Sequence, residues 1–310
     1  MNHLHKMAFV FPGQGSQSLG MLSESSNLHK IIIDTFAEAS DALGYDLWKL
    51  VQTGPVEKLN QTEYTQPALL TAGFALWRLF KTENQQRPVL FAGHSLGEYT
   101  ALVCANALTL REGVTLVRER GRLMQNAVPE GTGAMAAILG LEDEVVREIC
   151  FAVSEGEVVS PANYNSIGQV VIAGHEKAVL RAVERAKALG ARAIRLAVSV
   201  PSHCALMNSA AIQFREVLEA VELNLPTIPI IHNVDVSEHR DLVSLRQALI
   251  KQLYQPVRWV ETIQLMAARG ITSIFECGPG KVLSGLNKRI VPTIQCESVS
   301  YIQNGERICP

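Results

Sequence analysis

The sequence lacks the features of exported, zinc-binding and membrane-spanning proteins. No apolar run of signal-peptide length precedes Ala8, and the six cysteines form no Cys-x-x-Cys pair and have no histidine at zinc-ligand spacing. The uncharged stretch over residues 196–214 contains a proline, a histidine and three serines, so it is too polar for a membrane helix. We therefore expect a protein of the reducing cytoplasm, with no membrane span and no bound metal.

The chain also lacks an excess of charge of either sign. It has 28 lysines and arginines against 30 aspartates and glutamates, which disfavours nucleic acid or a membrane surface as the partner. Hydrophobic residues make up 47% of the 310 residues, enough for a buried core. This length predicts a large domain with a smaller insertion, and two lobes leave room for a cleft.

Strands and helices alternate in the larger part of the chain. Strands are expected over residues 8–11, 88–92, 228–232 and 271–276, and helices over residues 31–43 and 68–79. This alternation predicts a parallel α/β sheet with ligands beyond the carboxyl ends of its strands. We expect an α/β-hydrolase-like large domain over residues 1–130 and 200–310.

The pattern changes between residues 132 and 200. Strands are expected over residues 134–139, 158–162, 169–173 and 193–200, with helices over 142–153 and 176–189. The order β-α-β-β-α-β is that of the ferredoxin-like motif. We therefore expect residues 131–199 to form a small ferredoxin-like domain inserted into the larger one.

The segment Gly93-His94-Ser95-Leu96-Gly97 has the G-x-S-x-G spacing of a nucleophile elbow. A predicted strand precedes it and a helical pattern over residues 98–105 follows, and the small glycines tolerate a tight turn between them. The N-terminus of that helix favours developing negative charge. We expect Ser95 to be a nucleophile; the alternative is a chance match in a glycine-containing turn.

A serine hydroxyl needs a base within hydrogen-bond reach. His203 follows a predicted strand and begins a loop, which is typical of a catalytic base, and His232 at the end of another strand is the alternative. Asp235 and Glu276 are candidates for the acid of a triad, but neither stands in a recognisable motif. A backbone carbonyl could orient the imidazole instead, so a Ser-His dyad is the simpler hypothesis.

Arg120 lies inside the apolar stripe of a predicted helix over residues 111–127. An unpaired guanidinium is too costly to bury, so this side chain must be paired or must lie in a polar cavity. The two interpretations are a structurally paired arginine and a fork that binds a substrate carboxylate.

Two glycine-rich turns resemble nucleotide-binding loops only in part. Gly13-Gln14-Gly15-Ser16-Gln17 follows the first strand, but Ser18 occupies the third glycine position of a dinucleotide motif. A loop that offers a backbone N–H to an oxyanion, or an ordinary turn, fits it better. In Gly278-Pro279-Gly280-Lys281, Phe275 stands where a phosphate loop has its first glycine, so ATP binding is not expected.

Four motifs together resemble the malonyl-CoA:acyl carrier protein transacylase family of bacterial fatty acid synthesis. They are Pro12-Gly13-Gln14-Gly15-Ser16-Gln17, Gly93-His94-Ser95-Leu96-Gly97-Glu98-Tyr99, Pro201-Ser202-His203 and Gly278-Pro279-Gly280-Lys281, in this order. The similarity runs from Ala8 to about Val291, and the remaining tail is less typical. The resemblance implies Ser95 as nucleophile, His203 as base, and the backbone carbonyl of Gln252 as the group that orients His203.

The resemblance also implies the rest of the site. The oxyanion hole would use the backbone N–H groups of Gln14 and Leu96, and Arg120 would bind the malonyl carboxylate. Asn163 and Asn165 would face the cleft from the small domain. The implied reaction is a ping-pong transfer of malonyl from coenzyme A to acyl carrier protein through an ester on Ser95, by a monomer without a permanently bound cofactor.

Acyl carrier protein is acidic in this family, so docking on a near-neutral chain requires a local basic patch. The candidates for this patch are Arg192, Arg195, Lys281, Lys288 and Arg289. The alternative for these residues is an ordinary solvated face. Two other functions stay open at this point: a serine hydrolase, which would not require Arg120, and a non-catalytic subunit that binds the carrier protein.

Overall fold

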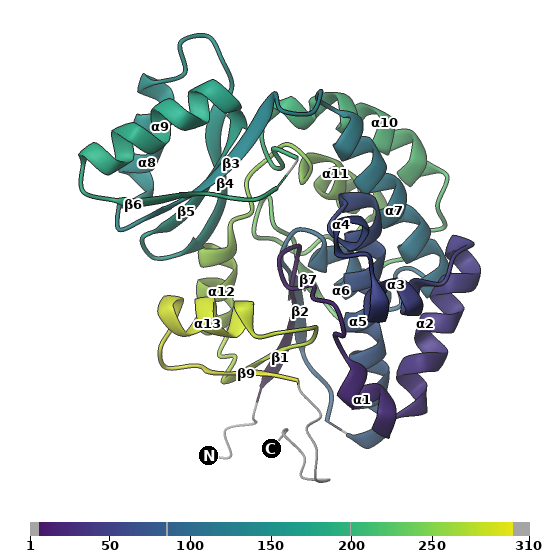
Figure 1. Ribbon diagram of the computed structural model, residues 1–310. Helices are drawn as coiled ribbons and strands as arrows, with labels where there is room; N and C mark the ends of the chain where they lie inside the picture. Colours follow the sequence, from purple (N-terminus) through teal and green to yellow (C-terminus); the bar gives the residue numbers. More distant parts are fainter. Residues whose placement is uncertain (1–5, 85, 199, 300–310) are drawn as a thin grey trace.

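Two sheets organise the chain in the computed structural model, which describes residues 6–84, 86–198 and 200–299. One sheet has five parallel strands and the other has four antiparallel strands (Figure 1). The predicted mixed α/β class with a parallel sheet is therefore confirmed. The outer limits expected for the two domains, residues 1, 199 and 310, lie outside the described residues.

The parallel sheet has the strand order β7-β2-β1-β8-β9. Its strands are β1 (Met7–Phe11), β2 (Leu90–Gly93), β7 (Ile230–Ile231), β8 (Ser273–Glu276) and β9 (Gln295–Ser298). Each of the four strands expected for this sheet overlaps one of them. The sequence analysis did not predict β9, which pairs in parallel with β8.

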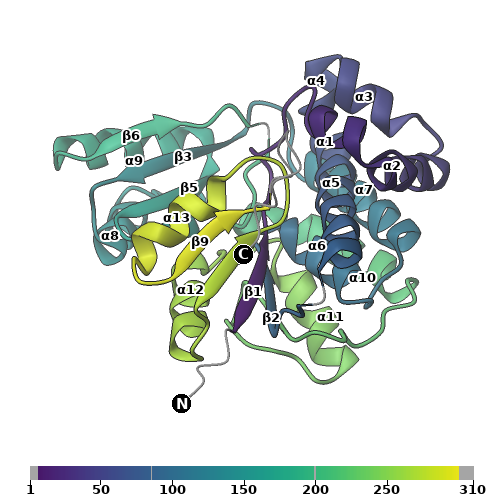
Figure 2. The same cartoon turned by 90° about the horizontal axis from the view of Figure 1, so that it is seen from below.

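Strand β1 is buried on both faces. Phe9 and Phe11 belong to the larger hydrophobic core, and Ala8 and Val10 belong to a second core on the opposite face. Successive side chains of a strand point to opposite faces, so a strand without a polar residue requires helices on both sides. Figure 2 shows this arrangement, with α5 and α6 on one side of β1 and β2 and α12 and α13 on the other.

The helices of the larger core cover one face of the parallel sheet. They are α2 (Lys30–Leu43), α3 (Leu47–Thr53), α5 (Thr62–Glu83), α6 (Gly97–Cys104), α7 (Leu110–Asn126), α10 (Asn208–Glu219) and α11 (Leu242–Lys251). The opposite face is covered by α12 (Trp259–Ala268) and α13 (Val282–Ile290). The short segments are α1 (Ser23–Leu28), α4 (Val56–Leu59) and the 3₁₀ turn η1 (Ala205–Met207). None of the helices in the described part of the chain is long and apolar enough to span a membrane.

The antiparallel sheet has the strand order β4-β5-β3-β6 and the expected element order β-α-β-β-α-β. Its elements are β3 (Gly133–Leu139), α8 (Asp143–Ala152), β4 (Val159–Ser166), β5 (Gln169–His175), α9 (Glu176–Ala188) and β6 (Arg192–Arg195). The strand expected over residues 193–200 is shorter than predicted. Beyond Leu196, whose N–H still bonds Met135, the chain leaves this sheet, and Ala197 and Val198 are exposed.

Strand β2 leads into α6 through a turn in which two backbones nearly touch. A Cβ atom on Gly97 would lie 1.9 Å from the Phe11 carbonyl oxygen, and one on Gly93 would lie 1.9 Å from the Gly97 carbonyl carbon. Only glycine fits at these two positions of the G-x-S-x-G motif, because a side chain would clash with the neighbouring backbone and push α6 away from β1.

We predict that Gly97→Ala lowers the free energy of unfolding by about 3 kcal/mol, because its methyl group clashes with rigid backbone. The matched control is Gly285→Ala in α13, where a Cβ atom meets nothing within 4 Å. That change should be neutral or stabilise by up to about 1 kcal/mol, because it adds helix propensity. Urea denaturation measures both, and equal stability of the two variants would contradict the assignment.

Candidate active site

Ser95 occupies the turn between β2 and α6 with a left-handed backbone, φ 52°. Only a few per cent of residues other than glycine adopt this conformation, so the surroundings must hold it. Asn233 does so with its side chain. Its Oδ1 accepts a hydrogen bond from the Ser95 N–H at 2.8 Å, and its Nδ2 donates to the Gly93 carbonyl at 2.6 Å.

His203 contacts the Ser95 hydroxyl. Its Nε2 lies 2.8 Å from Ser95 Oγ, and its Nδ1 lies 2.7 Å from the Gln252 carbonyl oxygen. A carbonyl oxygen only accepts hydrogen bonds, so Nδ1 carries the proton and the lone pair of Nε2 faces the serine. The structure thus brings together the three groups that the sequence analysis had assigned to a dyad oriented by a backbone carbonyl.

The His203 imidazole is held in its neutral form. Burial, and next the positive charge of Arg120, lower the pKa of His203 from 6.5 to about 3. Both causes disfavour a second positive charge in the site. A neutral imidazole can accept the serine proton at every physiological pH.

Arg120 is fully buried and points its guanidinium at the serine. Nη1 donates to Gln66 Oε1 at 2.8 Å, and Nη2 donates to Gln252 Oε1 at 2.9 Å and to Ser95 Oγ at 3.3 Å. The guanidinium also lies over the Tyr99 ring, 5.2 Å from its centre. Burial lowers the pKa of Arg120, as expected for a cation removed from water.

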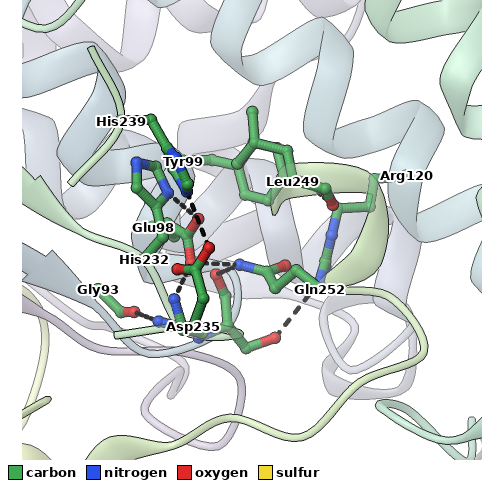
Figure 3. A network of polar contacts seen from close by, with 11 residues as sticks. Gly93, Glu98, Tyr99, Arg120, His232, Asp235, His239, Leu249 and Gln252 are labelled. Carbon is green, nitrogen blue, oxygen red and sulfur yellow. Dashed lines mark hydrogen bonds and ion pairs between the residues drawn. The ribbon is translucent and has the colours of Figure 1, made fainter. Parts of the chain in front are cut away.

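Gln252 and Glu98 join these groups into one buried network (Figure 3). Gln252 Nε2 donates to the Ser95 carbonyl and to Glu98 Oε2, each at 2.9 Å. Glu98 also accepts hydrogen bonds from the Asn233 N–H and from His232 Nδ1. All polar atoms of the Gln252 side chain are therefore committed between the nucleophile, a carboxylate and Arg120.

The loop after β1 lies against the elbow. A Cβ atom on Gly13 would lie 2.6 Å from the His94 carbonyl oxygen, so only glycine allows this approach. One on Gly278 would lie 2.4 Å from the Pro12 side chain, which packs the Gly278-Pro279-Gly280-Lys281 motif against the same loop. Gln14 is thereby carried next to the turn whose Leu96 caps α6.

Strand β4 brings Asn165 to the elbow from the other sheet and places Asn163 beside Val257. Asn165 Oδ1 lies 2.8 Å from His94 Nε2, and burial lowers the pKa of His94. Asn163 is 7% exposed, in a backbone bridge to Val257. The His94 ring therefore contacts the antiparallel sheet.

The alternatives to His203 and to a backbone orienter have other partners. His232 contacts Glu98, and Glu276 accepts hydrogen bonds from the Leu283 and Ser284 N–H groups at the start of α13. Asp235 lies 3.1 Å from the His239 imidazole. These contacts explain the residues structurally, and none involves His203.

The basic residues considered for docking do not form one uniform group. Arg195 pairs with Glu176 at 2.5 Å, and Arg289 donates to the Gln169 side chain at 3.2 Å. Arg192, Lys281 and Lys288 are exposed. The described residues contain no cluster of histidine, cysteine and carboxylate side chains that could hold a metal ion.

Sequence reasoning missed Gln66, Glu98 and Asn233. Glu98 is the only charged residue of α6, which is a signal that the sequence alone offers, and the structure buries it fully. Gln66 and Asn233 carry no comparable signal, because their partners Arg120 and Ser95 lie 54 and 138 residues away in the chain.

The comparisons with known proteins agree with this geometry. A family model described as an acyl transferase domain matches residues 8–291. The malonyl CoA-acyl carrier protein transacylase of Haemophilus influenzae is 55% identical over 301 residues, which cover 96% of each chain.

Solved structures are similar over the same length. The malonyl CoA-acyl carrier protein transacylase of Coxiella burnetii has a TM-score of 0.94 and 52% identity, and the match covers 95% of this chain and 93% of that one. A malonyl-transacylase solved in complex with its type II PKS acyl-carrier protein has a TM-score of 0.93 and 52% identity, and the match covers 96% of each chain.

The pKa of His203 yields a prediction for activity. The imidazole must be neutral to accept the serine proton, so activity falls as pH drops through its pKa. Because that pKa is lowered to about 3, the reactivity of the Ser95 hydroxyl as a nucleophile should not decline as pH passes through 6.5. Rapid-quench measurements of kcat/KM between about pH 5 and 8 test this, and a tenfold loss per pH unit below 6.5 would contradict it.

Proposed function

This chain belongs to the acyl transferase domain family and, within it, to the malonyl CoA-acyl carrier protein transacylases, and we propose that it moves malonyl between thiols through a Ser95 ester. The donor would be malonyl-CoA and the acceptor the phosphopantetheine thiol of acyl carrier protein. The reaction would supply fatty acid synthesis in the cytoplasm, with coenzyme A as substrate and no permanently bound cofactor. We propose that the enzyme acts as a monomer.

The observation that carries this proposal is a buried guanidinium beside the nucleophile. Arg120 forms no salt bridge with a carboxylate among the described residues, and its Nε has no hydrogen-bond partner there. A buried charge without a carboxylate in direct contact is costly, so an anion that arrives with the substrate would be bound strongly. A malonyl group has such a carboxylate, close to the carbonyl that Ser95 would attack.

In the first half of the reaction His203 Nε2 takes the Ser95 proton, and Oγ forms a bond with the thioester carbonyl carbon. The tetrahedral intermediate places negative charge on the former carbonyl oxygen. The carbon–sulfur bond then breaks, and the coenzyme A sulfur takes the proton from His203. Malonyl is left as an ester on Ser95.

The second half reverses these steps with a different thiol. His203 takes the proton of the phosphopantetheine thiol, the sulfur attacks the ester, and Ser95 recovers a proton as its carbon–oxygen bond breaks. Thioester-to-thioester exchange is nearly balanced in energy, so the enzyme mainly has to keep water from the ester. Arg120 would contribute by holding the far end of the acyl group.

We propose that the backbone N–H groups of Gln14 and Leu96 stabilise both oxyanions. The close contact of Gly13 with His94 supports this, because it brings the first loop to the elbow. Loss of one such donor typically lowers the rate by a factor on the order of 100. The backbone geometry of the first loop would therefore matter more than the Gln14 side chain.

We further propose a two-domain architecture for substrate entry. The parallel-sheet unit, residues 1–130 and 200–310, would be α/β-hydrolase-like, and residues 131–199 a ferredoxin-like insertion. Asn163 and Asn165 would line the cleft between them. An acidic carrier protein would dock on a basic patch. The patch would consist of Arg192, Arg195, Lys281, Lys288 and Arg289, which are all exposed.

The rival function is a serine hydrolase, and the fate of the acyl group separates the two. Wild-type protein mixed with malonyl-CoA alone should form a long-lived malonyl adduct, and Ser95→Ala should form none. Intact mass spectrometry measures the adduct. Rapid release of free malonate would support hydrolysis, and normal carrier binding without any adduct would support a non-catalytic subunit.

Arg120→Ala tests the carboxylate site. Removal of the guanidinium should lower kcat/KM for malonyl-CoA by about a hundredfold or more, the usual effect of losing a buried charge pair, and should favour acetyl-CoA. Competition between the two thioesters, read as the ratio of adducts on Ser95, measures the change. Unchanged preference for malonyl would refute the assignment of Arg120.

A further inference from the structure

The contacts of Arg120 have a common feature: every partner is electrically neutral. Nη1 and Nη2 donate to the amide oxygens of Gln66 and Gln252, and Nη2 also reaches the Ser95 hydroxyl. The fourth neighbour is the Tyr99 ring. A buried arginine is usually paired with a carboxylate, and here amides take that place although both amide residues are as buried as the arginine.

The two amide groups are held with their oxygens toward Arg120. Gln252 Nε2 points to Glu98 Oε2 at 2.9 Å, and Gln66 Nε2 points to Met124 Sδ at 3.7 Å. A carboxylate only accepts hydrogen bonds, and a guanidinium only donates them. If the Gln252 amide were reversed, its NH₂ would face Arg120 and its oxygen would face Glu98, so both contacts would become repulsive.

We propose that Gln66 and Gln252 form a neutral amide cradle that determines acyl specificity, because it fixes the direction of the Arg120 guanidinium and leaves its charge for the substrate carboxylate. This inference rests on the proposed function. Gln66 would then determine specificity through Arg120 alone, without touching the thioester or the nucleophile.

The cradle explains why amides are used here instead of carboxylates. A glutamate in place of Gln66 would keep the hydrogen bond at 2.8 Å and would turn it into a charge-assisted pair. The guanidinium would then be neutralised before the substrate arrives, and a malonyl carboxylate would meet a like charge beside it. The direction of the Arg120 guanidinium would be kept, but the preference for malonyl over uncharged acyl groups would be lost.

Glu98 brings a negative charge near Arg120 without contacting it. It is separated from Arg120 by the Gln252 amide, so it fixes the orientation of that amide without occupying the guanidinium. Figure 3 shows Gln252 between the two charged residues. The negative charge of Glu98 also raises the pKa of Arg120 and so opposes the effect of burial.

Gln66→Glu and Gln66→Met separate charge from shape. The methionine variant has a similar length and no charge: it loses the Nη1 hydrogen bond and so part of the orientation of Arg120, but it leaves the charge of the guanidinium free. It should therefore change the malonyl-to-acetyl ratio of kcat/KM for Ser95 acylation by less than about tenfold. The glutamate variant should lower this ratio on the order of a hundredfold, mainly through KM for malonyl-CoA, because two carboxylates would compete for one cation. Glu216→Gln on the exposed face of α10 is the control for a glutamate–glutamine exchange that leaves the cradle intact.

The inference is overturned if Gln66→Glu keeps the wild-type ratio, or if Gln66→Met loses as much of it as Gln66→Glu. Malonate ion is a second probe that does not depend on folding of the glutamate variant. It should raise the unfolding temperature of the wild type and of Gln66→Met, and not that of Arg120→Ala. Absence of this effect in the wild type would also overturn the cradle.

The outcomes distinguish this inference from the proposed function. If wild-type protein forms no adduct on Ser95 with malonyl-CoA, the proposed function itself fails. If the wild type forms the adduct and Gln66→Glu retains its preference for malonyl, the function stands and only the cradle is wrong.

Discussion

The hydrogen bonds of Gln252 are the interaction on which the site depends. Its backbone carbonyl orients His203, its side-chain oxygen holds Arg120, and its side-chain nitrogen binds the carbonyl of Ser95. One residue at the end of α11 thus sets the relative positions of three groups from different parts of the chain. A buried residue with all its polar atoms committed has little freedom to adopt another conformation, so the arrangement is rigid before substrate binds.

This dependence also explains why a carboxylate is absent next to His203. The imidazole is buried beside the Arg120 cation, and burial together with Arg120 keeps it neutral. A carboxylate at the place of the Gln252 carbonyl would stabilise the protonated imidazole and would also attract Arg120 away from the substrate. A neutral carbonyl fixes the imidazole tautomer without either effect.

Much of the fold and the centre of the site could be predicted because their signals are local. A few neighbouring residues are enough to predict three features. These are the buried strand at Phe9, the tight turn between the glycines on both sides of Ser95, and the buried arginine in the apolar stripe of α7. Strand β9 and the early end of β6 could not be predicted, because pairing with a distant strand decides them. Gln66 and Asn233 were missed for the same reason: a glutamine or asparagine in a sequence does not reveal which distant donor or acceptor it will meet. Glu98 was missed although it is the only charged residue of α6.

The junction between the two sheets has a consequence for how far they can move relative to each other. The N–H of Tyr164 bonds the Val257 carbonyl, the N–H of Val257 bonds the Ala162 carbonyl, and Asn165 meets the imidazole beside the nucleophile. The antiparallel sheet cannot move away from the turn that carries Ser95 without breaking these bonds. The space beside the nucleophile is therefore fixed by the fold, and any ligand has to fit it as it stands.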